Sequence, residues 1–217
     1  MAIPAAVWIL LALVVARLAL RPVLALVFGK RIGAAVLAKQ PATIHLQPAS
    51  ESAALVPAAI EADAQALMQE GFADVGWFTV PELPEVTLRL LAHEPEGWLG
   101  TVYEHRRAGR WVEINARFPD GSRTSFNNLR ATGLSQLPGV KTTRVAGRSA
   151  ANVLEAARAS RASGDLTPLA VGASTAVRVF EEGYAALTAL RREQGISRAE
   201  VAAVSVRRPL GRGKRAA

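Results

Sequence analysis

The first twenty residues are almost entirely apolar. Between Ala2 and Leu20 the one charged side chain is Arg17, and a helix needs about 20 apolar residues to cross the ~30 Å hydrocarbon layer of a membrane. Basic residues follow this run and none precedes it, which is the reverse of the order in a cleaved signal peptide. The pattern therefore predicts a single transmembrane anchor over residues 1–22.

The order of the charges also predicts an orientation. Basic residues collect on the cytoplasmic side of a span, so we expect the amino terminus outside and the soluble part in the cytoplasm. Three alternatives stay open. The apolar run could be a buried core helix, the span could lie at Val7–Phe28 with Arg17 and Arg21 inside the bilayer, or an inverted anchor could hold the soluble part in the periplasm.

Residues 23–50 are expected to be a juxtamembrane linker. Residues 23–38 are apolar, but Lys30, Arg31 and Lys39 do not gather on one side of a helical wheel. The pattern therefore leaves open whether this segment lies on the membrane or in the soluble domain. Residues 43–47 are bracketed by Pro41 and Pro48, which favours a short extended piece or an edge strand.

Residues 51–164 show the pattern of an α+β domain. A helix is predicted from Pro57 to Glu70, and Gly71 supplies its cap. Five short segments with strand character then follow, joined by tight turns, at 75–80, 86–92, 98–106, 111–118 and 123–129. Such a series predicts an antiparallel β-meander of about five strands flanked by helices.

The meander is expected to have one apolar face. Val112, Ile114, Ala116 and Phe118 alternate with polar residues, and an apolar sheet face needs a covering layer. The helix at 57–70 and a second predicted helix at 149–162 are the natural cover.

A C-terminal pair of helices is predicted over residues 165–206. Thr167 and Pro168 are expected to begin the first, which carries an apolar seam, and Ser197 with Glu200 has the spacing of a capping box for the second. Residues 207–217 form a basic tail that we expect to be disordered. The seam consists of Val177, Phe180, Tyr184, Leu187 and Leu190.

Charge is concentrated at the two ends of the chain. The net charge is +8, yet residues 1–40 and 206–217 each hold five basic residues and no acid, which leaves 16 basic against 18 acidic residues between them. This distribution argues against a core that binds nucleic acid. The ends are instead expected to attract anionic lipid head groups. The basic residues concerned are Arg17, Arg21, Lys30, Arg31, Arg207, Arg208, Arg212, Lys214 and Arg215.

The amino-acid composition excludes cysteine chemistry and points to a bacterial origin. The chain has no cysteine, which rules out disulfides, thiolate nucleophiles and cysteine-rich zinc sites. The histidines lack metal-ligand spacing, so we expect no metal and no cofactor. Arginine and alanine, both with GC-rich codons, are abundant. This composition favours a bacterium with a GC-rich genome, and together with the predicted anchor it indicates an inner-membrane protein.

The sequence favours a binding or scaffolding module with a protein partner or self-association. One expected surface is an arginine-rich polar face of the sheet, with Arg89, Arg106 and Arg117. The other is the C-terminal seam, with Val177, Phe180, Tyr184 and Leu187. The alternative is an enzyme whose site collects residues from neighbouring strands, namely His105, Arg107, Glu113 and Asn115.

Overall fold

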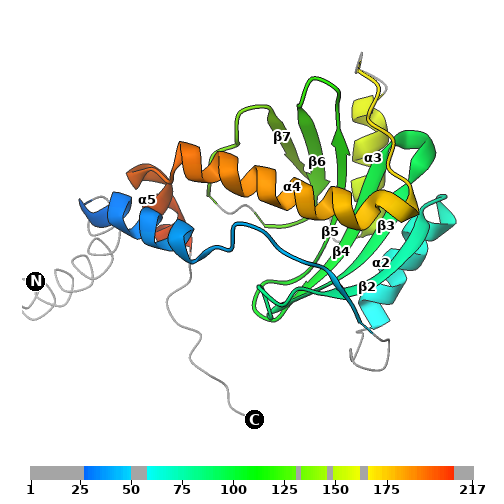
Figure 1. The fold of residues 1–217 in the computed structure, drawn as a ribbon, viewed down its shortest axis with the longest axis horizontal. Helices are drawn as coiled ribbons and strands as arrows, with labels where there is room; N and C mark the ends of the chain where they lie inside the picture. The colour runs from blue at the N-terminus through cyan, green and yellow to red at the C-terminus, as the bar shows by residue number, and fades with distance from the viewer. Residues whose placement is uncertain (1–26, 50–57, 131–132, 146–148, 162–165, 208–217) are drawn as a thin grey trace, which may run out of the picture. The chain divides into compact units, whose positions relative to one another are not determined.

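The computed structural model describes residues 27–49, 58–130, 133–145, 149–161 and 166–207 (Figure 1). These residues form two compact units. The larger unit takes its described residues from 41–130 and 136–190, and the smaller unit takes them from 27–40, 133–135 and 191–207. The α+β class predicted from the sequence is confirmed.

A seven-stranded mixed sheet forms the centre of the larger unit. The strands follow one another across the sheet in chain order, and every neighbouring pair is antiparallel except the last, β6 and β7, which is parallel. The prediction of about five antiparallel strands was therefore wrong in number and for the last pair. The strands are β1 (Gln47–Pro48), β2 (Ala73–Thr79), β3 (Val86–His93), β4 (Trp98–His105), β5 (Gly109–Arg117), β6 (Arg123–Asn127) and β7 (Val140–Arg144).

One face of the sheet is covered by α2 (Ala58–Gln69) and α3 (Ala150–Arg161), as predicted. Ile60 and Leu67 from α2 and Val153 from α3 pack on Val112 and Ile114 of β5. All five side chains are at most 1% exposed. This face holds one of the two apolar cores.

The opposite face of the sheet is also apolar over β3 and β4, so the expectation of a single apolar face was wrong. Leu88 and Leu90 of β3 pack there with Val179 of α4 (Ala173–Gln194). The register explains the difference. Leu88 pairs with Tyr103 and Tyr103 with Trp111, which places Leu88 on the opposite face from Val112. Figure 1 shows α4 crossing this face of the strands.

The β5–β6 hairpin has the predicted turn at Pro119, Asp120 and Gly121. Gly121 has φ +83°, which favours glycine. The Phe118 amide donates to the Ser122 carbonyl at 3.0 Å, closing the turn. Because the turn fixes the register, the two strands present matched pairs of side chains to the α4 face.

α4 begins at Ala173 and not at Thr167 and Pro168 as predicted. Residues 166–172 have no helical structure. The Leu169 amide donates to the Arg117 carbonyl at 2.8 Å, so this segment is attached to the end of β5. The tertiary hydrogen bond replaces the helical one that the local pattern favours.

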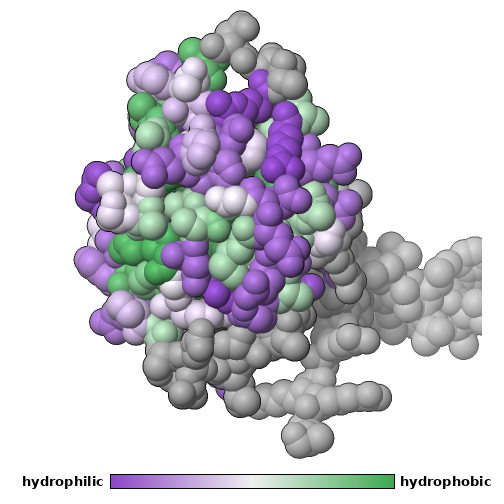
Figure 2. Space-filling view, turned by 90° about the vertical axis from the view of Figure 1, so that its right-hand side faces the viewer, coloured by the Kyte–Doolittle hydropathy of each residue, from purple (hydrophilic) through white to green (hydrophobic). Residues whose placement is uncertain are grey.

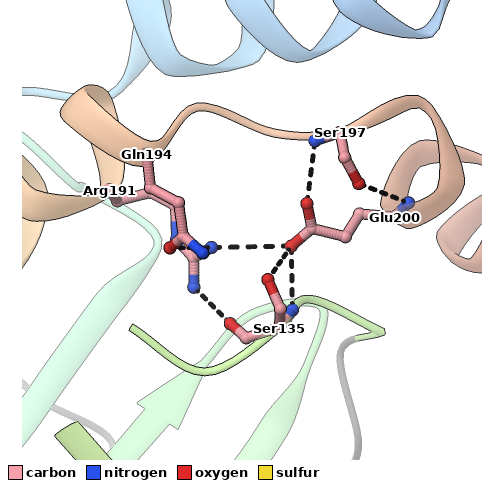
Figure 3. A network of polar contacts seen from close by, with 5 residues as sticks. All are labelled: Ser135, Arg191, Gln194, Ser197 and Glu200. Atoms are coloured by element: carbon pink, nitrogen blue, oxygen red, sulfur yellow. Dashed lines mark hydrogen bonds and ion pairs between the residues drawn. The ribbon is translucent and has the colours of Figure 1, made fainter. Parts of the chain in front are cut away.

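The smaller unit contains a helix over residues 27–39 and α5 (Arg198–Arg207). The predicted capping box of α5 is confirmed, because the Ser197 amide donates to Glu200 Oε2 at 2.8 Å and the Glu200 amide donates to Ser197 Oγ at 3.2 Å. Figure 3 shows that Glu200 also receives the amide and hydroxyl of Ser135, at 2.8 and 2.6 Å. Arg191 lies 3.5 Å from the same carboxylate.

Exposed hydrophobic residues are few in the described chain. The face in Figure 2 is mainly hydrophilic, with hydrophobic residues gathered in limited areas. The large hydrophobic side chains that are exposed belong to two segments, the helix at 27–39 and the segment before α4. They are Val27, Phe28, Ile32, Val36, Leu166 and Leu169.

Within the described residues, no helix combines the length and the apolar character needed to cross a membrane. The predicted anchor, residues 1–22, lies outside the described residues, and so do residues 208–217 of the basic tail.

Candidate functional site

A cavity of about 190 Å³ lies in the larger unit between the α4 face of the sheet and α4 itself. For scale, an engineered apolar cavity of about 150 Å³ holds one benzene molecule. The apolar part of the wall comes mainly from α4 and the segment before it. The apolar lining includes Leu99, Leu169, Val171, Val179, Phe180, Tyr184 and Leu187, and the polar lining includes Tyr103, Glu113, Asn115, Arg117, Arg123, Ser125 and Thr142.

Glu113 is the centre of one polar cluster in this wall. Its Oε1 accepts a hydrogen bond from Ser125 Oγ at 2.5 Å, and Asn127 Nδ2 donates to the same Ser125 oxygen at 3.2 Å. The side chains of Tyr103 and Asn115 also hydrogen-bond the carboxyl. The side chains that hydrogen-bond the Glu113 carboxyl are therefore all neutral donors.

Burial raises the pKa of Glu113 above its ordinary value, and the hydrogen bond from Ser125 opposes that rise in pKa. Burial also raises the pKa of Tyr103 well above its ordinary value, and the negative charge of Glu113 adds to the effect. The Tyr103 hydroxyl thus stays a proton donor at neutral pH. A carboxyl with a raised pKa facing a cavity is a group that can give or take a proton there.

Asn127 supports the cluster from behind. It is 6% exposed, and its Oδ1 has no hydrogen-bond partner among the described residues. Buried polar atoms are nearly always satisfied by protein or by ordered water. The unpaired acceptor therefore marks a place for an ordered water molecule behind the cavity wall, because Asn127 is not one of the residues that line the cavity.

Arg117 and Arg123 form a second polar cluster. They are paired residues of β5 and β6, and Arg117 lies four residues along β5 from Glu113, a separation of about 13 Å between Cα atoms. Arg117 Nη1 lies 3.5 Å from a carboxylate oxygen of Glu182 on α4. The two clusters thus stand apart in the same wall.

The positive charge of Arg123 is less well neutralised than that of Arg117, which lies beside Glu182. Its Nη1 donates to the Gly183 carbonyl of α4 at 2.9 Å. Burial lowers the pKa of Arg123, and the positive charge of Arg117 lowers that pKa further. No acid of the described residues contributes to the pKa of Arg123. A half-buried guanidinium of this kind favours an anion beside it.

The structure brings together residues that the sequence assigned to separate surfaces. Glu113 and Asn115 came from the enzyme alternative, and Arg117 came from the arginine-rich face. Phe180, Tyr184 and Leu187 came from the C-terminal seam. All six line the cavity. The seam of α4 therefore packs on its own sheet and encloses this space. Val177 is half-buried against the core beside it.

Arg123 and Ser125 were missed in the sequence, although a signal for them was present. The turn at 119–121 places Arg123 opposite Arg117 and Ser125 opposite Asn115. Extending the polar face of β5 across that hairpin would have found both residues.

His105 and Arg107 do not reach the cavity. His105 Nε2 lies 3.6 Å from a carboxylate oxygen of Glu85, and Arg107 Nη2 lies 3.0 Å from the other oxygen. His105 Nδ1 accepts from the backbone amides of Arg107 and Ala108. These contacts explain the placement, because His105 closes the β4–β5 turn. The expected four-residue site is therefore split.

Arg89 does not share a face with Arg117. It is 5% exposed on the side covered by α2, where its guanidinium donates two hydrogen bonds to Asp74, at 3.1 and 2.9 Å, and also pairs with Glu61. Arg106 is exposed in the β4–β5 turn. The expected arginine-rich face is thus divided among three places, because alternate residues of a strand point to opposite faces.

The basic residues expected at a membrane surface are placed only in part. Lys30 and Arg31 are exposed on the helix at 27–39, and Arg207 ends α5. The other six lie outside the described residues, namely Arg17, Arg21, Arg208, Arg212, Lys214 and Arg215.

Neither a metal site among the described residues nor a similar protein of known function indicates what the cavity binds. In the part of the chain that the structure describes, no group of three or more histidine, aspartate or glutamate side chains lies close enough together to hold a metal ion. Comparison of the chain with models of protein families, with curated proteins and with solved structures found no match.

Proposed function

We propose that the larger unit binds a small carboxylate with an apolar body in the cavity under α4. The observation that carries this proposal is the half-buried Arg123, which lines an apolar cavity and has no acid of the described residues contributing to its pKa. A bound carboxylate would accept two hydrogen bonds from a guanidinium and offset the repulsion between Arg123 and Arg117.

The apolar wall supports the choice of ligand class. Phe180, Tyr184 and Leu187 present ring and aliphatic surface, which a fully polar anion would leave unused. The volume suits a molecule slightly larger than benzene, such as benzoate or hexanoate. A ligand of nine or so non-hydrogen atoms is expected to bind with about −4 to −6 kcal/mol, or roughly millimolar to tens of micromolar affinity.

Calorimetric titration of the full chain in detergent tests this function. Benzoate and hexanoate are compared with benzamide and hexanol, which keep the apolar body and lose the negative charge. Loss of a hydrogen bond to a charged group costs about 1.5–3 kcal/mol, so Arg123→Gln is expected to weaken carboxylate binding about 10- to 100-fold. Arg106→Gln, in the exposed β4–β5 turn, is the matched control and leaves binding unchanged. Equal binding of acid and amide, or an unaffected Arg123→Gln variant, contradicts the proposal.

The membrane anchor belongs to the same proposal. Its support is the sequence of residues 1–22, with an apolar run followed by basic residues. In this arrangement the chain is a single-pass protein of a bacterial inner membrane that holds its binding unit in the cytoplasm. Ultracentrifugation of cell extracts tests the anchor, and a carboxyl-terminal reporter that is active on only one side of the membrane tests the orientation. Intact chain in the supernatant would contradict the proposed anchor. Reporter activity on the outer side would show that the orientation is the reverse of the one proposed.

An enzyme is the second candidate, and Glu113 favours it. This carboxyl combines a raised pKa, donors from Ser125 and Tyr103 and a place in the cavity wall. Nuclear magnetic resonance of a bound carboxylate during long incubation separates the two functions. Consumption of the ligand that stops in Glu113→Gln while binding persists identifies catalysis, whereas an unchanged ligand supports simple binding.

A further inference from the structure

The helix at 27–39 has one face packed within the smaller unit. An added Cβ at Gly29 would lie 2.8 Å from the Arg198 Cα, and one at Gly33 would lie 2.9 Å from the Ile196 Cβ. Leu37, which follows at the same spacing, is buried. The two glycines therefore allow the helix to approach the start of α5 closely.

The same helix exposes three large apolar side chains on another face. Phe28, Ile32 and Val36 are spaced four residues apart and so lie along one side of the helix. Their exposed fractions are 46%, 42% and 54%. Soluble proteins rarely leave such aligned residues in water, and an apolar stripe of this kind marks an interaction surface.

The chain before this helix indicates what covers the stripe. Residues 2–20 are apolar except for Arg17, and residues 21–26, which follow, can span at most about 20 Å. If residues 2–20 cross a bilayer, as in the proposed function, the helix begins within that distance of the membrane surface.

Charge points to the same partner. Lys30 and Arg31 are exposed on this helix, and residues 1–50 contain no acid. Each basic side chain near an anionic leaflet contributes about 1 kcal/mol of attraction. A helix with an apolar stripe and neighbouring basic residues is the kind of element that lies in the head-group region of a membrane.

We propose that the helix at 27–39 lies on an anionic membrane surface, with Phe28, Ile32 and Val36 inserted among the lipids and with Lys30 and Arg31 at the head groups. This inference rests on the proposed anchor. It goes beyond the anchor because it assigns a surface of the smaller unit to the bilayer. The helix then holds α5 beside the membrane through the contacts of Gly29 and Gly33.

Single-cysteine labelling can test the proposal cleanly, because the chain has no native cysteine. The full chain is reconstituted into vesicles of phosphatidylcholine and phosphatidylglycerol with an environment-sensitive fluorophore at Ile32→Cys. Ala108→Cys, in the exposed β4–β5 turn, is the control. We expect blue-shifted emission at position 32 and quenching by brominated lipids, with neither effect at position 108.

Other outcomes decide against the surface helix without confusing it with the anchor. A label at position 32 that reports water while the chain still sediments with vesicles overturns the surface helix and leaves the anchor intact. A blue-shifted label that brominated lipid does not quench overturns it too, and indicates a protein partner or a second copy of the chain. A chain that fails to sediment overturns both proposals.

A second pair of variants tests the charge argument without changing the stripe. Lys30→Gln combined with Arg31→Gln removes two exposed charges and is expected to keep the fold. Phosphatidylglycerol should then promote quenching at position 32 less, because losing two charges lowers the apparent partition coefficient of the helix into anionic vesicles by about 30-fold. Replacement of Lys141 and Arg144 on β7 by glutamine is the control, and an equal loss in that variant contradicts the role assigned to Lys30 and Arg31.

Discussion

Ser125 of β6 donates a hydrogen bond of 2.5 Å to Glu113 of the neighbouring strand β5. The contact joins two strands whose register is set by their hairpin turn. It also places a titratable group in the cavity wall, where its protonation affects both stability and binding.

Ser125→Ala is expected to destabilise the fold. The change leaves a carboxyl oxygen of Glu113 without its donor, and an unsatisfied buried group costs about 1–3 kcal/mol in the free energy of unfolding. Urea unfolding measures the loss. Ser174→Ala, at an exposed position of α4, should stay within about 0.5 kcal/mol of the wild-type chain, and a similar loss in both variants would contradict the explanation.

Glu113→Gln should remove a pH dependence of stability. Because burial raises the pKa of Glu113 in the folded chain above its ordinary value of 4.5, the unfolded chain releases this proton first as the pH rises. The wild-type free energy of unfolding then falls between pH 4.5 and the folded pKa, and the loss is complete above that pKa. Unfolding measured across this range should show the fall in the wild type and a smaller one in Glu113→Gln. Parallel curves for the two chains would be evidence against a raised pKa.

Gly183→Ala is expected to stabilise the chain and weaken the binding of carboxylates. Glycine inside a helix costs about 1 kcal/mol relative to alanine, and an added Cβ would lie 3.6 Å from Arg123 Nη1, which is ordinary contact. The methyl group occupies space in the cavity wall beside the cation, so benzoate affinity should fall about 3- to 10-fold. Thermal unfolding and calorimetry measure the two effects. The control is Ala185→Gly, which tests the effect of glycine on the stability of α4 at a position that does not line the cavity. Gly195 is unsuitable as a control because its φ of +72° disfavours alanine.

Glu200→Ala should loosen the start of α5. Burial acts to raise the pKa of Glu200, but hydrogen bonds from the Ser135 hydroxyl and from the amides of Ser197 and Ser135 outweigh it and lower the pKa to about 2. Loss of such a cap costs about 1 kcal/mol or more. Faster amide exchange at Ser135 and Ser197 is the readout, and Glu193→Ala, at an exposed position of α4, is the control.

The sign of the pH effect at Glu200 is opposite to that at Glu113. A lowered folded pKa stabilises the chain above the ordinary value of 4.5 and loses that contribution as the pH falls toward about 2. Amide protection of α5 in the wild type should therefore weaken over that acid range, and the Glu200→Ala variant should show no such change.

Local patterns were enough to predict α2, α3, the β5–β6 hairpin and the cap at Ser197. Each depends on residues close together in the sequence, such as the turn at Pro119 to Gly121 or the spacing of Ser197 and Glu200. β7 has no comparable local signal. Its pairing with β6 is parallel and depends on the path of residues 128–139, which the sequence pattern does not specify.

The candidate site was predictable in its parts and not as a whole. Glu113, Arg117 and Tyr184 were each singled out, but no local pattern indicates that α4 crosses the polar half of the sheet. The alternation of apolar and polar residues divides each strand into two faces. It does not show which face of one strand lies on the same side of the sheet as a given face of the next strand. That information lies in the register, which puts Arg89 beside Val102 and so on the opposite face from Arg117.

The short first strand has a consequence for association between copies of the chain. β1 consists of Gln47 and Pro48 at one edge of the sheet, and proline has no amide hydrogen to offer an incoming strand. A strand from another molecule would find only a brief ladder of donors and acceptors there, which discourages the edge-to-edge growth that leads to fibrils. This edge of the sheet is thereby protected against aggregation through strand pairing.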